Sequence, residues 1–524
     1  MPPVFLRLCA NKKFFLIFTA LFFIFPNIFA QKAKHLSKDT TYATFITIPP
    51  EVLTTLQESK TAHYIYLKNN TLSLENYPTL TQKTLTYLEN RGFPFASIYL
   101  DSIAERSDTV FAQLAINKNQ RCVFDSIVVR GNLKIAKSYL KAYFNFKKKK
   151  PYNESIVKQI PQLIQELPFV EEKQPSAVEF TEENASLYLF LDKKRVNQFD
   201  GYIGLVPVSD RSGKIAVSGE MNLHLMNLFT IGESLDLQWR ATERFSQFLE
   251  LKANFPYLVG TPLGVDGLFM LDKKDTTYLN MNYVIGLFYS FKGYNFARVY
   301  FDYATSNILD KNLYDASHAL TYSDYKKTMY GFAFRFRDLD FIYNPRKGYD
   351  LNLNVAVGSR KIIENAQSPQ NDDVDLVTVR YRLHGKIRGY IPLHKRWVLG
   401  LGAEGGALFG KQHLTNELFR IGGMNSLQGF DDLSIRASNY GTGLVELRFL
   451  IAKIAYINAF FNGAWYEQKL SGNYLNDFPF GFGAGIAFTT KAGLFYLSYA
   501  LGKQLDNPIS FKTGKIHFGL AVQF

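Results

Sequence analysis

Residues 349–357 read YDLNLNVAV, a run in which apolar side chains return at every second position. A period of two predicts a β-strand with one apolar face and one polar face. The same alternation continues through most of residues 197–524, for example in residues 235–240 and 377–384. This part of the chain is therefore predicted to be all-β.

About sixteen such runs can be counted, and outer-membrane barrels have an even number of strands. Each strand together with its connection takes about 20 residues, which matches the strand and turn lengths of such barrels. They begin near residues 199, 214, 233, 245, 263, 280, 295, 326, 348, 375, 396, 441, 454, 480, 492 and 513. A soluble β-sandwich rarely needs so many long strands. Aromatic residues make up 15% of the chain and the mean hydropathy is -0.10. We therefore predict an all-β transmembrane β-barrel of about sixteen antiparallel strands over residues 196–524.

The N-terminus has the pattern of a secretory signal peptide. Basic residues precede an apolar run at residues 14–29, and Ala30 offers a small residue before a cut. Residues 1–30 are thus predicted to be a leader, with a retained membrane anchor as the alternative. The net charge is +14, but nucleic acid is a poor explanation for the charge of an exported chain. The lysine run at residues 147–150 is interpreted as a solvated loop, or as a contact with acidic lipid headgroups.

Residues 31–195 have the pattern of two small α/β modules, residues 31–120 and 121–195. In the second module we expect strands and helices at residues 122–131, 136–144, 153–166, 176–180 and 186–192. In the first module we expect a helix at residues 80–90 and strands at 93–100 and 110–118, while the earlier elements stay unassigned. Such modules act through exposed strand edges that can pair with another polypeptide, or they serve as spacers.

One stretch of the barrel region does not alternate, namely residues 418–430, LFRIGGMNSLQGF. Gly422, Gly423 and Gly429 suit a backbone that folds tightly or approaches another surface closely. The apolar residues of this stretch, including Phe430, argue against disorder. An ordinary surface loop is the alternative to a functional one.

No residue pattern points to catalysis or to a metal. The eight histidines form no HExxH pair, and there is no G-x-S-x-G elbow. Residues 400–405 satisfy G-x-G-x-x-G, but no helix follows, so the glycines are better explained by a curved wall or by close packing inside it. The same holds for the glycines of residues 481–485. We expect no cofactor and no enzyme activity, with a hydrolase assembled from distant strands as a remote alternative.

Several cations share one face of a predicted strand. They are Arg380, Arg382, His384, Lys386 and Arg388, with Arg335 and Arg337 on another strand. Each would cost about 2–4 kcal/mol in lipid near the midplane, so these faces are expected to point into a hydrated lumen. The expected balancing acids are Glu220, Asp236, Glu250, Glu404 and Glu446.

The C-terminal strand, HFGLAVQF at residues 517–524, ends on a phenylalanine. Its positions His517, Gly519, Val522 and Phe524 resemble the signal by which outer-membrane barrels are recognised for insertion. The β-α-α-β-β order of the modules resembles the polypeptide-transport-associated (POTRA) domain. Together with the glycine loop, these features make the chain similar to the BamA/TamA superfamily of outer-membrane assembly barrels, also called the surface-antigen family, over roughly residues 80–524.

This resemblance implies that the glycine loop folds back into the lumen and carries a tip triplet that normally contains arginine. Here the matching triplet is Gln428-Gly429-Phe430. Glu446 is the expected wall partner, and without the arginine it keeps at best a neutral hydrogen bond. The alternatives are that Arg420 or Arg436 substitutes for the missing arginine, or that Arg448 satisfies Glu446 instead.

The function that the resemblance implies is noncovalent assembly, insertion or translocation of outer-membrane proteins in a Gram-negative bacterium. POTRA modules in the periplasm would receive unfolded outer-membrane protein clients. A lateral gate would open between the last strand and the first strand, which carries Tyr202, Gly204 and Pro207. The expected partners are these clients and outer-membrane lipids, and accessory periplasmic or lipoprotein subunits are left open. The alternatives are a polypeptide secretion pore and a passive solute channel.

Overall fold

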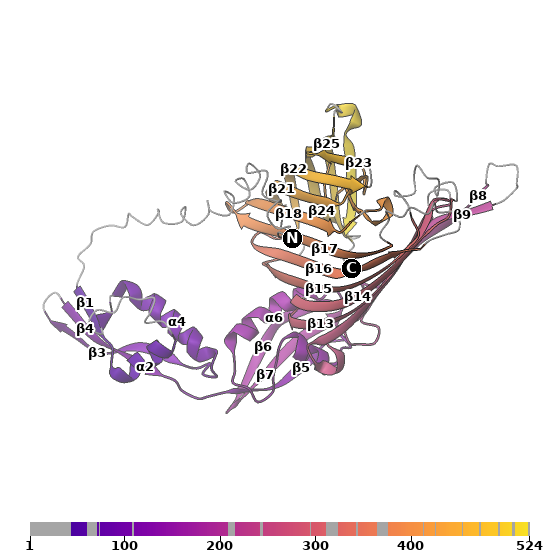
Figure 1. Ribbon diagram of the computed structural model, residues 1–524. Coiled ribbons are helices and arrows are strands. Elements are labelled where there is room, and N and C mark those ends of the chain that lie inside the picture. Colours follow the sequence, from indigo (N-terminus) through magenta and orange to yellow (C-terminus); the bar gives the residue numbers. More distant parts are fainter. Residues whose placement is uncertain are drawn as a thin grey trace. The chain divides into compact units, whose positions relative to one another are not determined.

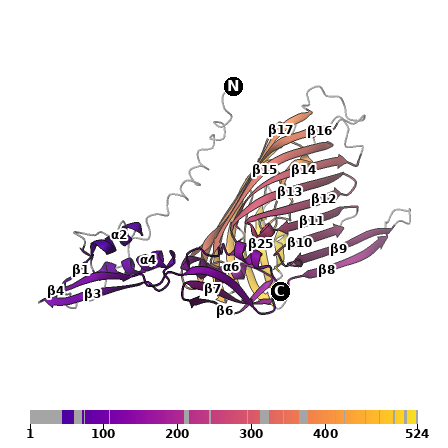
Figure 2. The ribbon, with the colours of Figure 1, turned by 90° about the horizontal axis from the view of Figure 1, so that it is seen from below.

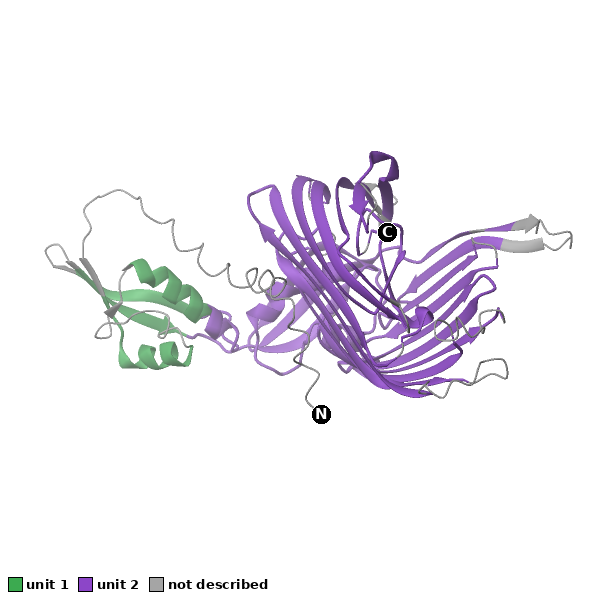
Figure 3. Cartoon of the chain, turned by 45° about the horizontal axis from the view of Figure 1, so that its top comes forward, with its two compact units in different colours: residues 1–85, 97–117 green, residues 86–96, 118–524 purple. Residues whose placement is uncertain are grey.

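The computed structural model (Figure 1) describes residues 43–59, 71–72, 74–106, 109–207, 215–241, 245–293, 295–310, 323–341, 344–363, 376–411, 413–424, 426–452, 454–470, 473–490, 493–505 and 509–521. The predicted leader, residues 1–30, lies outside them, as do Val522 and Phe524 of the predicted C-terminal signal. The chain forms two compact units, residues 1–85 with 97–117 (unit 1) and residues 86–96 with 118–524 (unit 2; Figure 3). No helix in the described ranges is long and apolar enough to cross a membrane.

Unit 1 is a small mixed α/β domain on a four-stranded sheet of order β2-β1-β4-β3. Its elements are β1 (Ala43–Thr47), α2 (Pro50–Glu58), β2 (Thr71–Leu72), η2 (Leu74–Asn76), α4 (Tyr77–Glu89), which continues into unit 2, β3 (Ser97–Arg106) and β4 (Thr109–Asn117). Helix α2 begins at Pro50, whose fixed φ suits a first turn. Strand β3 starts at Ser97, four residues after the predicted start at residue 93, because turns precede it. Strand β1 and helix α2 are the early elements that could not be assigned from the sequence.

The second module, in unit 2, has the predicted β-α-α-β-β order. It contains β5 (Val123–Arg130), α5 (Lys137–Tyr143), α6 (Glu154–Glu166), β6 (Val170–Thr181) and β7 (Asn184–Lys193). The sheet order is β5-β7-β6, so β6 pairs only with β7 and leaves its other edge unpaired within this three-stranded sheet. Asn153 caps α6, because its side chain accepts a hydrogen bond from the Ile156 amide at 3.1 Å. Ile160, Leu163 and Ile164 bury the inner face of the helix.

The rest of unit 2 is an antiparallel barrel in which sequence neighbours pair (Figures 1 and 2). Its strands are β8 (Gln198–Pro207), β9 (Ile215–Met226), β10 (Ser234–Ala241), β11 (Gln247–Phe255), β12 (Leu263–Lys274), β13 (Tyr278–Lys292), β14 (Asn295–Ile308), β15 (Tyr325–Leu339), β16 (Gly348–Ile362), β17 (Val377–Pro392), β18 (Trp397–Phe409), β21 (Asn439–Ala452), β22 (Ala455–Leu470), β23 (Asn473–Asp477), β24 (Phe480–Thr490), β25 (Gly493–Lys503) and β26 (Lys515–Ala521). A short 3-10 helix, η3 (Leu258–Gly260), joins β11 to β12, and another, η6 (Phe511–Thr513), precedes β26.

Strands β23 and β24 are one strand with an interruption. Both pair with β22, and Tyr466↔Asp477 and Gly463↔Phe480 continue the same register. The break falls at Pro479, which has no N–H for the ladder. Counted this way, the barrel has sixteen strands, which confirms the fold predicted from the alternation.

The alternation of the strands places apolar side chains on the outside of the wall. In β13, Ile285 is 69% exposed while its neighbour Val284 is buried. An outward apolar row and an inward row of small or polar residues are what a lipid-embedded barrel requires. The wall therefore has a lumenal face, and this face receives the loop described below.

The second module packs against the turns at one end of the barrel. Tyr257, in the turn after β11, contacts the rings of Tyr139 and Tyr143 at centroid distances of 5.4 and 5.7 Å. The Tyr257 hydroxyl donates to the Gly293 carbonyl at 2.8 Å. The side-chain amide nitrogen of Gln162 in α6 donates to the Leu339 carbonyl at 2.7 Å, next to the turn between β15 and β16. The module is thus fixed to several turns on the same end of the barrel.

The barrel closes where its last strand meets its first. β26 pairs with β25 from Leu494↔Ala521 to Ala500↔Lys515, and the strand order continues from β26 to β8. Strands β26 and β8 are hydrogen-bonded neighbours in this order, so the sheet is closed at their junction. We call this junction the seam. Gly204 and Pro207 lie in β8 and pair with β9.

Candidate functional site

The non-alternating stretch belongs to a long connection between β18 and β21, residues 410–438, which we call the lumenal loop. It contains η5 (Thr415–Glu417) and a small hairpin of β19 (Phe419–Ile421) and β20 (Ile435–Ala437), paired from Phe419↔Ala437 to Ile421↔Ile435. Its apolar side chains Ile421, Leu427 and Phe430 are buried with wall residues of β21 and β22. The loop is therefore packed and is not a surface loop.

The tip of the loop presses on the inner wall near the seam. The Gly429 amide donates to His517 Nε2 at 3.1 Å, and the Asn462 side chain donates to the Gln428 carbonyl at 3.3 Å. The Ser498 hydroxyl donates to Gln428 Oε1 at 3.4 Å. These wall residues alternate with exposed apolar neighbours such as Phe518, so they face the lumen. The tip thus touches β22, β25 and β26 from inside the barrel.

Glycines on both surfaces make this contact close. Gly429 has φ +99°, and a Cβ there would lie 2.8 Å from the Leu501 carbonyl oxygen. A Cβ on Gly481 would lie 2.2 Å from the Gln428 carbonyl oxygen, and one on Gly519 would lie 2.7 Å from Met424 Cε. Of the glycines at residues 481–485, Gly481 thus faces the packed loop, whereas the atoms nearest to Gly483 and Gly485 belong to neighbouring strands.

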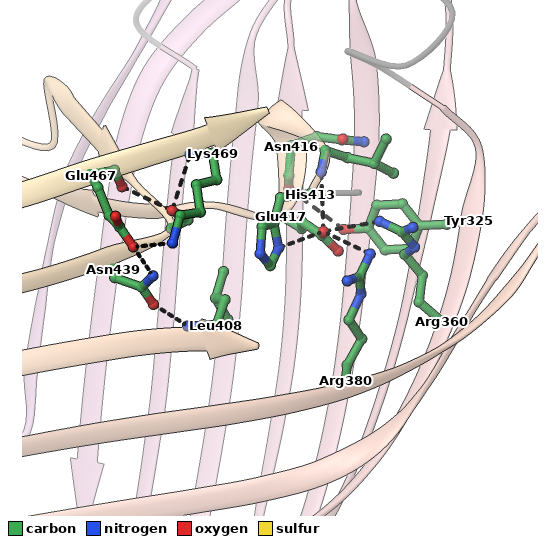
Figure 4. Close-up of polar contacts among 12 residues, drawn as sticks. Tyr325, Arg360, Arg380, Leu408, His413, Asn416, Glu417, Asn439, Glu467 and Lys469 are labelled. Carbon is green, nitrogen blue, oxygen red and sulfur yellow. Dashed lines mark hydrogen bonds and ion pairs between the residues drawn. The ribbon is translucent and has the colours of Figure 1, made fainter. Parts of the chain in front are cut away.

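The N-terminal arm of the loop is fixed by a buried carboxylate (Figure 4). Glu417 Oε1 accepts from Arg360 Nη1 at 2.9 Å and from the Leu414 amide at 3.0 Å, and it lies 3.3 Å from Arg380 Nη2. The side chains of Arg360 and Glu417 are 0% and 4% exposed. Asn416 beside it donates to the Ser306 hydroxyl at 2.8 Å. The arm is thereby tied to β14, β16 and β17.

The C-terminal arm is held by Glu467 of β22 (Figure 4). The Ser438 amide donates to the Glu467 carbonyl at 2.8 Å, and Asn439 hydrogen-bonds the Glu467 carboxylate, which also pairs with Lys469 at 2.8 Å. Asn439 Oδ1 accepts from the Leu408 amide of β18 at 3.1 Å. Both ends of the loop are therefore anchored, and between them the chain crosses from one wall of the barrel to the other.

The electrostatics of the N-terminal anchor favour an ionised carboxylate. Burial by itself would raise the pKa of Glu417, but the adjacent His413 imidazole and the charges of Arg360 and Arg380 lower this pKa to about 2. The carboxylate is thus charged at neutral pH and keeps two buried guanidinium groups compensated.

The expected pairing of the tip with Glu446 is replaced by another arrangement. Glu446 accepts from Arg448 Nη2 at 2.8 Å and from the Asn458 amide at 2.6 Å. Arg448 also lies between the rings of Tyr390 and Tyr456, 4.8 and 4.6 Å from their centroids. Among the alternatives, Arg448 is the one that satisfies Glu446, and Gln428 has Ser498 and Asn462 as partners instead.

Most of the predicted lumenal cations have acidic partners, but mostly other acids than expected. Arg382 pairs with Asp302 at 2.7 Å, Arg337 with Asp350 at 2.7 Å, and Lys386 with Glu404 at 2.6 Å. Glu404 was among the expected partners, whereas Asp302, Asp350 and Glu417 were missed. No sequence signal marks these three, because their partners come from strands whose register only the folded barrel defines.

The other predicted positions lie as follows. His517 and Gly519 of the C-terminal signal are in β26 and contact the loop tip, as described above. Tyr202, Gly204 and Pro207 are in β8, and the side chain of Tyr202 is not described. The described residues contain no group of histidine, cysteine, aspartate and glutamate side chains that could hold a metal ion.

Comparisons with known proteins agree with this architecture. Residues 227–524 match the Omp85 superfamily domain. CdiB from Escherichia coli has the same fold, with a TM-score of 0.52 and 14% identity over 94% of this chain and 92% of that one. CdiB from Acinetobacter baumannii matches with a TM-score of 0.51 and 14% identity over 93% of this chain and 91% of that one. BamA from Haemophilus ducreyi lacking POTRA domains 1-3 matches with a TM-score of 0.47 and 15% identity over 92% of this chain and 98% of that one. No curated protein sequence matches the chain.

We predict that Glu417→Gln destabilises the barrel by about 3 kcal/mol, because it removes the negative charge that pairs with the buried Arg360 and Arg380 side chains. The measurement is the temperature at which the folded barrel unfolds in detergent. In the wild type the lowered pKa of Glu417 stabilises the fold above its ordinary pKa of 4.5, and this stabilisation is lost as the pH falls from 4.5 towards 2. The matched control is Asp431→Asn, which removes an exposed ion pair and should cost less than about 1 kcal/mol. Equal effects of the two substitutions would contradict the anchor.

We also predict that restoring a cation at the tip does not stabilise this barrel. Gln428→Arg would place a charge beside the neutral Ser498 and Asn462 side chains, and should cost about 1 kcal/mol or more. Glu446→Gln should cost about 3 kcal/mol, because Arg448 loses its counter-charge. Unfolding temperatures of both variants test this. A higher unfolding temperature for Gln428→Arg would show that the tip still has an acidic partner.

Proposed function

Because the chain belongs to the Omp85 superfamily, we propose that it assembles and inserts other proteins into the outer membrane without covalent chemistry. The chain itself is a non-enzymatic outer-membrane barrel of a Gram-negative bacterium, with POTRA-like domains on the periplasmic side. Polypeptides are the class of client that the family implies. We propose that these clients are unfolded outer-membrane proteins.

The observation that carries the proposal is the contact between the loop tip and the seam. Gly429 hydrogen-bonds His517, and Lys515 pairs with Asp431 at 2.8 Å, so the loop holds the strand that borders the seam. We propose that the hydrogen bonds between β26 and β8 are the ones that separate when the wall opens, so that backbone groups of the last strand become available for another strand. We propose that a client strand adds to this edge and that outer-membrane lipids receive it when the seam opens.

The periplasmic modules would present the client to the seam. β6 of the second module has one unpaired edge in its own sheet, and an extended segment could add there by backbone hydrogen bonds. The tyrosine contacts of Tyr257 with α5 keep the module at the barrel's periplasmic turns. A client bound to the module is then already close to the barrel.

Two other functions compete with insertion, namely a polypeptide secretion pore and a passive solute channel. The lumenal loop crosses the interior and is anchored by buried polar pairs at both ends, which favours a plugged barrel over a steadily open channel. Conductance of the purified barrel in planar bilayers would separate the solute channel from the other two. A large, steady, ungated current would favour the solute channel.

We predict that covalent closure of the seam abolishes client insertion. A panel of cysteine pairs, with one cysteine in Gln198–Pro207 and one in Lys515–Ala521, would be oxidised in reconstituted membranes and tested for insertion of an unfolded barrel client. Loss of insertion on oxidation, and its recovery on reduction, is the expected result, because the edge strands can no longer separate. Cys122 is buried and should not interfere.

The matched control is a cysteine pair at Gln238 and Glu250, which lie directly opposite each other in the wall. Joining these strands should leave insertion unchanged. Full insertion by a seam-locked barrel would contradict the gate, and loss of secretion with unchanged insertion would favour the secretion pore.

A further inference from the structure

A cavity of about 440 Å³ lies in unit 2 beside the second module, away from the barrel wall. We call it the basic pocket. It is formed where three segments meet, namely residues 90–91, residues 121–124, which lead into β5, and residues 145–156. Its lining includes the basic side chains Arg91, Arg121, Lys147 and Lys150. Two members of the lysine run therefore have a structural setting that the assembly function does not explain.

Backbone hydrogen bonds hold the three segments together. The Cys122 amide donates to the Gly92 carbonyl at 2.7 Å, and the Phe124 amide donates to the Lys150 carbonyl at 2.9 Å. In return the Lys149 amide donates to the Phe124 carbonyl at 2.7 Å. Lys149 has φ +63°, which a lysine rarely adopts and which this double hydrogen bond maintains. The lysine run is thus a fixed turn, and the pocket exists before any ligand arrives.

The charge of the basic pocket is uncompensated. No aspartate or glutamate is among its lining residues, and in the described part of the chain Arg121, Lys147 and Lys150 have no ion-pair partner. Lys148, which does not line the pocket, pairs with Asp125 at 3.1 Å. Like charges gathered around one concave surface raise the local potential and attract an anion. The pocket is therefore suited to a negatively charged group.

The remaining lining favours a peptide over a phosphate headgroup. Phe124, Pro151 and Ile156 supply an apolar surface, and Asn145 supplies a side-chain amide, whereas the side-chain oxygens of Asn153 and Asn90 already accept from the Ile156 and Ser155 amides. Amides both donate and accept hydrogen bonds, as a peptide backbone requires, whereas a phosphate only accepts.

The pocket also lies at the N-terminal end of α6, a 13-residue helix whose other end is at the barrel turn of Gly293. Such a helix is about 18–20 Å long, so the pocket stands off from the barrel turns.

We propose that the basic pocket binds a carboxylate of an acidic polypeptide segment, with Arg121 and Lys150 as its principal ligands. This proposal rests on the proposed function, because the segment would belong to a client on its way to the barrel. Arg121 offers a planar pair of donors and Lys150 a point charge, a combination that suits a carboxylate. The apolar surface and the Asn145 amide would hold the peptide on either side of the acidic residue.

The test is fluorescence anisotropy with the full chain in lipid nanodiscs. The probe is a labelled ten-residue peptide with three glutamates, and its counterpart has glutamines in their place. The double variant Arg121→Gln/Lys150→Gln should weaken binding at least about tenfold, the order expected for the loss of charge-assisted hydrogen bonds. The matched control Lys149→Gln changes a lysine of the same turn that does not line the pocket, and should bind within about twofold of the wild type.

Each other outcome overturns the proposal. Equal binding of the glutamate and glutamine peptides removes the carboxylate as the ligand, and equal binding by the double variant removes the pocket as the site. Displacement of the peptide by an equal concentration of inorganic phosphate, or binding of anionic lipid vesicles without peptide binding, would assign the pocket to phosphate instead.

Client insertion is measured separately. Normal insertion by the wild type together with no peptide binding defeats the pocket alone, and pocket-dependent binding with insertion unaffected by seam locking defeats the gate alone.

Discussion

A carboxylate buried inside a barrel needs a counter-charge, and the position of the lumenal loop depends on this requirement at Glu417. Desolvation of an isolated ion is costly, so Glu417, Arg360 and Arg380 are stable only together. Two of these residues belong to the wall and one to the loop. The ion cluster therefore fixes where the loop enters the lumen, and Glu467 fixes where it leaves.

Between these anchors, the loop carries a constraint from one wall to the other. Its tip is seated by backbone approaches that only glycine permits at Gly429 and Gly481, and it ends against His517 of the last strand. The strand beside the seam is thus held by the loop as well as by β25. A change in the loop would alter the freedom of that strand, which is the physical link between a plugged lumen and a seam that can open.

Much of the fold follows from local pattern. The alternation at residues 349–357 marks β16, whose observed start at Gly348 is the predicted one, because the period of two is set by one apolar face. Helix α6 and its cap at Asn153 follow from similarly local signals. Strand β6 is longer than predicted and begins at Val170, since its pairing with β7 extends it through a charged stretch with no alternation.

The site was less predictable because its partners are remote in sequence. The glycines and the Gln428 tip could be singled out, but the pairing of Glu417 with Arg360 spans 57 residues and depends on the register of several strands. The same holds for the choice of Arg448 over the tip as the partner of Glu446. A substitution at the tip could therefore be seen in the sequence, while its compensation by the wall could not.

The central claim is that the loop tip lies inside the barrel against the last strand. Cysteines at Asp431 and Lys515, whose side chains pair at 2.8 Å, test it with a short bis-maleimide in intact outer membranes. We predict efficient cross-linking, equal to that of a control pair at Asp236 and Lys252, which lie opposite each other in the wall. Cross-linking of the control pair without any at Asp431 and Lys515 would contradict the claim.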